Sequence, residues 1–68
     1  MNNSDARAQA KRWLDSGRLS LAMLWLQYWG QGGNAGIWEL DAFIHEALVL
    51  DAYDNAILGW ALEAFAPR

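Results

Sequence analysis

The fold is decided by the stretch Leu19-Ser20-Leu21-Ala22-Met23-Leu24-Trp25-Leu26-Gln27-Tyr28-Trp29. At the helical spacing of 100° per residue, Ser20 and Gln27 fall with Gln31 on one thin polar line, and the other positions are apolar. A helix that is apolar nearly all round is buried on most sides. We therefore predict a helix from Arg18 to Trp29, which is either the central helix of a bundle or the seam between copies of the chain.

A membrane span is not expected here. The run from Leu19 to Trp38 contains no charged residue, but only its first eleven residues are mainly apolar. A spanning helix needs about 20 such residues. An acidic chain is also poorly suited to binding anionic lipids. We expect no contact with a membrane.

Apolar residues at helical spacing predict another helix on the N-terminal side, from Asp5 to Ser16. Ser4 is its expected cap, and Gly17 is expected to end it in the left-handed conformation. On the other side, residues 30–36 are rich in glycine. We interpret them as a flexible connector between helices.

The C-terminal half is expected to hold two more helices. One covers Ile37 to Leu50, where apolar residues occupy one broad face. Asp51 is then expected to cap the other helix. That helix is expected to run to Ala66, before Pro67 ends it.

The predicted core takes its residues from these apolar faces. The face of helix 37–50 consists of Ile37, Leu40, Phe43, Ile44, Ala47, Leu48 and Leu50, and that of the last helix of Tyr53, Ala56, Ile57, Trp60, Ala61, Ala64 and Phe65. The residues expected at the centre are Leu24, Ile44, Ile57 and Trp60. Gly59 lowers helix propensity by about 1 kcal/mol relative to alanine, which indicates a close approach of another helix.

The predicted fold class is therefore all-α, a compact bundle of four short helices. Sixty-eight residues suffice for one domain, 1–68, of which 1–3 are expected to be disordered. The sequence contains no cysteine, so neither a disulfide nor a thiolate metal site can stabilise it. The N-terminus lacks the pattern of a signal peptide, and the expected compartment is the cytoplasm.

Composition points to an interaction surface. Hydrophobic residues make up 54% of the chain, including five tryptophans, and so small a domain has little interior to bury them. Some apolar surface is therefore expected to remain exposed, which usually marks an interface.

The charges suggest the kind of partner. The net charge is −3, which argues against a nucleic-acid-binding face. Residues 1–34 carry four basic and two acidic residues, and residues 35–68 carry one basic and six acidic residues. This asymmetry suits pairing within the chain, self-association, or an acidic face that meets a basic partner.

Chemistry-bearing motifs are weak. His45-Glu46-Ala47-Leu48-Val49 begins like the metalloprotease pattern, but Val49 replaces the second histidine, so no metal is expected. Gly30-x-Gly32-x-x-Ala35 matches a dinucleotide-binding pattern without the required strand, so no cofactor is expected. We predict that the chain is not an enzyme.

The outward side of helix 37–50 is the predicted docking surface. There Trp38, Ala42 and Val49 form a second apolar stripe, bordered by Asp41 and His45 on one edge and by Glu39 and Glu46 on the other. An apolar strip with a central aromatic and a charged border is typical of protein-binding patches. The alternative is that the first helix covers this stripe, with its Arg and Lys residues meeting the acids.

Three function classes remain open. The first is a small acidic adaptor or stoichiometric inhibitor that docks on a larger protein with a basic rim, such as a nucleic-acid-handling complex with a basic cleft. The second is a homo-oligomeric helical protein, at least a dimer, with helix 18–29 as its seam. The third is a carrier of a small apolar ligand between helices.

Overall fold

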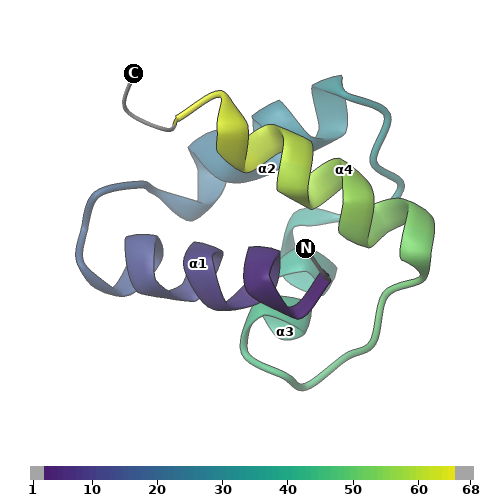
Figure 1. Cartoon of the computed structure of the whole chain (residues 1–68), viewed down its shortest axis with the longest axis horizontal. Helices are drawn as coiled ribbons and strands as arrows, with labels where there is room; N and C mark the ends of the chain where they lie inside the picture. Colours follow the sequence, from purple (N-terminus) through teal and green to yellow (C-terminus); the bar gives the residue numbers. More distant parts are fainter. Residues whose placement is uncertain (1–2, 66–68) are drawn as a thin grey trace.

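The computed structural model describes residues 3–65 and confirms an all-α fold (Figure 1). Four helices follow one another along the chain: α1 Asn3–Asp15, α2 Leu21–Gly30, α3 Ile37–Ile44 and α4 Ala52–Glu63. α1 and α2 each pack against both α3 and α4, so all four helices contribute to one core. None of the helices in residues 3–65 is long and apolar enough to cross a membrane.

α1 begins two residues earlier than predicted and ends one residue earlier, with Gly17 in the predicted left-handed conformation. It begins at Asn3, so Ser4 lies within the helix and is not its cap. The disorder expected for residues 1–2 concerns residues outside the described part of the chain. At the other end, Gly17 has a φ of 79°. Its N–H donates to Leu14 O at 3.2 Å and Arg18 N–H donates to Trp13 O at 3.0 Å, the two bonds of a Schellman motif.

α2 begins three residues later than predicted. The Ser20 hydroxyl accepts a hydrogen bond from Met23 N–H at 3.2 Å and so caps the first turn. A second Schellman motif ends the helix, with Gly32 at a φ of 102°. Within one copy of the chain, α2 is not buried on most sides, so it is not the central helix of the bundle. Only Leu24 and Tyr28 are fully buried, and an entire apolar side of α2 faces outward.

α3 ends at Ile44, six residues before the predicted end at Leu50. Glu46 adopts a φ of 65°, which stops the helix. Glu46 N–H donates to Phe43 O at 3.0 Å, and Ala47 N–H donates to Ala42 O. These are again the bonds of a Schellman motif, with glutamate where glycine is usual. Because no glycine marks this stop, helical spacing alone could not reveal it.

α4 is capped as predicted, by Asp51, whose Oδ1 accepts from Asp54 N–H at 2.9 Å. The helix ends at Glu63, and the predicted end at Ala66 lies outside the described residues. Gly59 faces α1 as expected of a close approach. A Cβ there would lie 3.9 Å from Cβ of Ala6, an ordinary contact distance, so the approach does not require glycine.

The buried face of α4 is rotated by about one residue from the predicted face. Leu24, Ile44 and Ile57 lie in the core as predicted, but Trp60 is 55% exposed and was wrongly placed there. The face that points inward consists of Asp54, Asn55, Ile57, Leu58, Ala61 and Leu62. Asp54 and Asn55 belong to this face because both have hydrogen-bond partners within the chain. A prediction of the buried face from apolar residues alone therefore chooses the wrong side of the helix.

Candidate protein-docking surface

Trp38 is displayed by the first turn of α3. Gly36 precedes the helix, and its N–H donates to Glu39 Oε1 at 2.8 Å, which fixes the start of the helix. Leu40, Phe43 and Ile44 then point into the core. This phase turns Trp38 outward, where 76% of its surface is exposed. An indole so exposed at a capped helix start contributes little to the fold.

The predicted apolar stripe is shorter than expected. Trp38 and Ala42 are one turn apart on α3 and share a side of the helix. Val49 does not continue this stripe, because α3 has already ended at Ile44. Val49 lies in the connection to α4 and is 88% exposed. The structure thus places Trp38 and Ala42 on one side of α3, and Val49 lies outside that helix.

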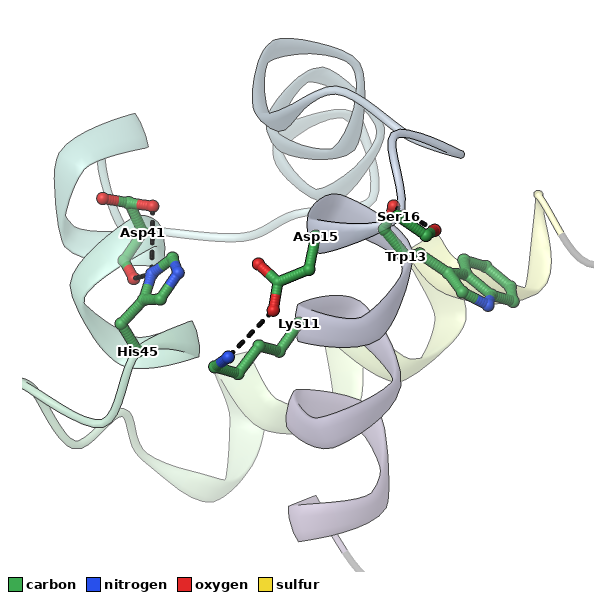
Figure 2. Close-up of polar contacts among 6 residues, drawn as sticks. All are labelled: Lys11, Trp13, Asp15, Ser16, Asp41 and His45. Atoms are coloured by element: carbon green, nitrogen blue, oxygen red, sulfur yellow. Dashed lines mark hydrogen bonds and ion pairs between the residues drawn. The ribbon is translucent and has the colours of Figure 1, made fainter.

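One edge of this surface turns toward α1. His45 Nδ1 lies 2.9 Å from Asp41 O and 3.2 Å from Asp41 Oδ1. Both neighbours accept hydrogen bonds, so Nδ1 is the nitrogen that carries the proton. Figure 2 shows Lys11 and Asp15 on α1 opposite this pair, joined to each other at 2.9 Å.

The charges of this edge influence one another across the two helices. The hydrogen bond between Lys11 and Asp15 raises the pKa of Lys11 and lowers the pKa of Asp15. When His45 is protonated, its positive charge also lowers the pKa of Asp15. All four side chains are exposed to solvent, so these pairs are screened and contribute little stability.

The acids on the other edge already have partners within the chain. Glu39 caps the start of α3, as described above. The Glu46 carboxylate lies 3.4 Å from Arg7 Nη2 of α1, and the Arg7 guanidinium lies 5.7 Å from the centre of the Phe43 ring. The alternative that α1 meets these acids therefore holds for Glu46. Trp38 nevertheless remains uncovered.

A second apolar surface was not among the predicted site residues. Met23, Leu26 and Trp29 follow one another at spacings of three along α2, and they are 55%, 59% and 60% exposed. We call these three residues the α2 outer face. On the polar line of the sequence, Ser20 and Gln31 are exposed and Gln27 is half-buried, and Gln31 Nε2 donates to Trp60 O of α4 at 3.4 Å. In a helix that is apolar all round, no residue pattern shows which side stays exposed.

The only buried ionisable cluster in residues 6–65 joins α2, the glycine-rich connection and α4. Tyr28 Oη donates to Asp54 Oδ1 at 2.7 Å and accepts from Asn34 N–H at 3.1 Å and from Ala35 N–H at 2.9 Å. Asp54 Oδ1 also accepts from Asn34 N–H at 3.0 Å.

Burial and the bond to Asp54 raise the pKa of Tyr28 to about 12. Burial opposes the ionisation of Asp54, but the hydrogen bonds from Asn34 and Tyr28 outweigh it and lower the Asp54 pKa. Within the described residues no buried side-chain polar atom lacks a partner. This cluster therefore joins α2, the glycine-rich connection and α4, and each of its buried side-chain polar atoms has a partner within the chain.

Groups of three or more potential metal ligands are not found in the described part of the chain. Comparison with models of protein families, with curated proteins and with solved structures gives no match to this chain. The exposed apolar side chains of α2, α3 and α4 are therefore the features on which a function can be argued.

Proposed function

We propose that this protein is a non-catalytic protein-interaction module that docks on a larger partner through Trp38 and the residues around it on α3. The observation that carries the proposal is the 76% exposure of Trp38 on a helix whose start is fixed by a side-chain cap. Tryptophan is the residue most enriched among interface hot spots. A rigid indole also binds at a low cost in conformational entropy.

The charges around Trp38 favour a partner with a basic rim. Glu39 and Asp41 flank it on α3, and the whole chain carries a net charge of −3. Carboxylates at the rim of an interface act mainly on the association rate, because they steer a basic partner. A small acidic adaptor or a stoichiometric inhibitor fits this description.

The test is a binding measurement with matched variants. Binding partners captured from the source cell by the wild-type chain are identified, and the affinity of each is measured for Trp38→Ala and Trp60→Ala. Trp60 is the matched control, because it is also a tryptophan more than half exposed, but it lies on α4. We expect Trp38→Ala to raise Kd at least about 30-fold, which corresponds to about 2 kcal/mol. Trp60→Ala should leave Kd within about threefold.

The electrostatic part of the proposal is tested with Glu39→Gln. Glutamine keeps an oxygen that can accept from Gly36 N–H, so the start of α3 is preserved while one charge is removed. We expect slower association and a weaker dependence on salt, with little change in dissociation. A Trp38→Ala variant that folds and binds every captured partner normally would contradict the proposed docking surface.

A further inference from the structure

The α2 outer face differs from every other helix surface of the protein in its charge. α2 contains no Asp, Glu, Lys or Arg, whereas α1, α3 and α4 each contain acidic residues. Its three large side chains, Met23, Leu26 and Trp29, are each more than half exposed. Methionine and tryptophan are enriched at interfaces relative to the remaining surface of proteins.

Neighbouring side chains hold this face in place. Trp25 Nε1 donates to Ala35 O at 3.0 Å, which fixes its indole against the glycine-rich connection. Trp29 stacks on Trp25 with ring centres 6.0 Å apart and an angle of 25° between the planes. A pre-ordered aromatic surface loses little side-chain entropy when it is covered.

A further exposed tryptophan lies near this face, on α4. The hydrogen bond from Gln31 to Trp60 O places the backbone of Trp60 beside the C-terminal end of α2. Trp60 is 55% exposed. The exposed parts of Met23, Leu26, Trp29 and Trp60 together amount to roughly 400–500 Å². Patches of this size on a monomer are often functional.

Charge favours a second copy of this chain as the occupant. Two molecules that each carry a net charge of −3 repel one another, so they associate best through a face that brings no carboxylates together. Two α2 outer faces in contact would bury no charge. A foreign partner selected by charge complementarity would find nothing on this face to select it.

We propose that the α2 outer face is the interface of a homodimer, in which α2 packs antiparallel against α2 of a second copy. Leu26 lies in the middle of the face, so the twofold axis passes close to it. In an antiparallel pair, the positive N-terminal end of each helix dipole also lies beside the negative C-terminal end of the other. Two such patches, each with Trp60 included, bury roughly 800–1,000 Å² in total, less than a usual specific interface, so the dimer is weak, with Kd above the low micromolar range.

The proposal is tested by sedimentation velocity over a concentration series of the full chain. We expect a monomer at low micromolar concentration and a dimer near millimolar concentration. Leu26→Glu and Leu26→Lys should both weaken the dimer at least about 30-fold, because each places two like charges against one another at the twofold axis. Leu26 is 59% exposed, so both variants should fold, which circular dichroism will verify.

The pair of variants separates an interface effect from an effect of net charge. Leu26→Glu raises the net charge from −3 to −4, and Leu26→Lys lowers it to −2. If net charge alone governed association, the lysine variant would dimerise more tightly than the wild type, and the proposal would fail. Val49→Glu adds the same charge outside α2 and should leave the dimer nearly unchanged.

Other outcomes overturn the proposal in distinct ways. A wild-type monomer at every concentration would exclude self-association. If that monomer bound neutral phosphatidylcholine vesicles through Leu26 and Trp29, the occupant would be a lipid surface. Docking through Trp38 is measured separately, since Trp38→Ala should leave the sedimentation of the free chain unchanged.

Discussion

The two connections on either side of α3 end their preceding helices in the same way but are held very differently. Residues 31–36 follow α2, and residues 45–51 follow α3. In the first, Gly33 and Ala35 are buried, and two N–H groups donate to Tyr28. In the second, residues 45–49 are all exposed. The glycine-rich connection, which the sequence suggested was flexible, is the better anchored of the two.

The difference lies in what each connection offers to the core. In the 31–36 connection, two backbone N–H groups donate to the buried Tyr28 hydroxyl and the buried Asp54 carboxylate. Leaving these two buried acceptors unpaired would cost free energy. The 45–51 connection is held near its end, where Asn55 Nδ2 donates to Leu50 O at 3.0 Å and to Asp51 O at 2.9 Å. How a connection is anchored to the core therefore depends on its buried partners rather than on its glycine content.

The largest expected effect tests how tightly the first connection packs. A Cβ on Gly33 would overlap Cζ, Cε1 and Cε2 of the Tyr28 ring. Tyr28 is fully buried and cannot move aside without breaking its hydrogen bonds. We expect Gly33→Ala to lower the free energy of unfolding by about 3 kcal/mol or more, measured by urea denaturation.

The matched control for Gly33→Ala is Gly30→Ala. Gly30 is the last residue of α2, and a Cβ there would meet nothing within 4 Å. Alanine is the better helix former, so this variant should be neutral or more stable by up to about 1 kcal/mol. Equal destabilisation by both variants would show that the connection needs flexible glycines rather than space beside Tyr28.

Removal of the Tyr28 hydroxyl tests the buried partners directly. Tyr28→Phe leaves Ala35 N–H without an acceptor and Asp54 without its hydroxyl donor, and we expect a loss of about 2 kcal/mol in the free energy of unfolding. Tyr53→Phe is the control. Its hydroxyl donates to Gly32 O at 3.1 Å from an exposed position, so its removal should cost less than about 0.5 kcal/mol. Similar losses for the two variants would contradict the assigned difference in burial.

The sequence allowed the four helices and most of the core to be predicted, because those depend on local spacing and on glycine at helix ends. Leu24, Ile44 and Ile57 were found in this way. The phase of α4 was not, because Asp54 is buried through a hydroxyl 26 residues away along the chain. A pairing so distant leaves no local pattern.

The candidate site shows the same division. Outward placement of Trp38 followed from helical spacing on α3 and was predicted. The position of Val49 outside α3 was not predicted, because α3 ends at Ile44 and no glycine marks that end. Neither could the sequence show which side of α2 faces outward, because that depends on how α3 and α4 pack against it.

A smaller effect is expected from pH, with opposite signs for the two members of the buried cluster. The pKa of Asp54 is lowered on folding, so its contribution to stability is present above the unfolded pKa and is lost as pH falls through the folded pKa, below about pH 4. The pKa of Tyr28 is raised to about 12, so its contribution is present below about pH 10 and is lost as pH rises toward 12.

This pH dependence is checked by urea denaturation at acid, neutral and alkaline pH. Asp54→Asn should flatten the acid side of the profile, and Tyr28→Phe should flatten the alkaline side. Each variant is compared with the wild type at the same pH values, because Lys11, Asp15 and other exposed groups titrate in the variant as in the wild type. An acid side as steep in Asp54→Asn as in the wild type would show that other carboxylates govern it.

The smallest effect concerns the second connection and has the opposite sign to the others. Glu46 holds a φ of 65° in the position that Gly17 and Gly32 occupy after α1 and α2. An L-residue with a Cβ is strained there by about 1–2 kcal/mol, and replacing it with glycine relieves this strain. Part of the resulting gain in stability is offset, because glycine makes the unfolded chain more flexible. We expect Glu46→Gly to raise the free energy of unfolding by about 0.5–1 kcal/mol.

Glu46→Gln is the matched control, because it keeps the Cβ and removes only the charge that faces Arg7. This ion pair is exposed, with 3.4 Å between the two groups, so the variant should change the free energy of unfolding by less than about 0.5 kcal/mol. If Glu46→Gly were no more stable than Glu46→Gln, backbone strain at Glu46 would not lower stability. The weaker anchoring of the second connection would then be due only to its lack of buried partners.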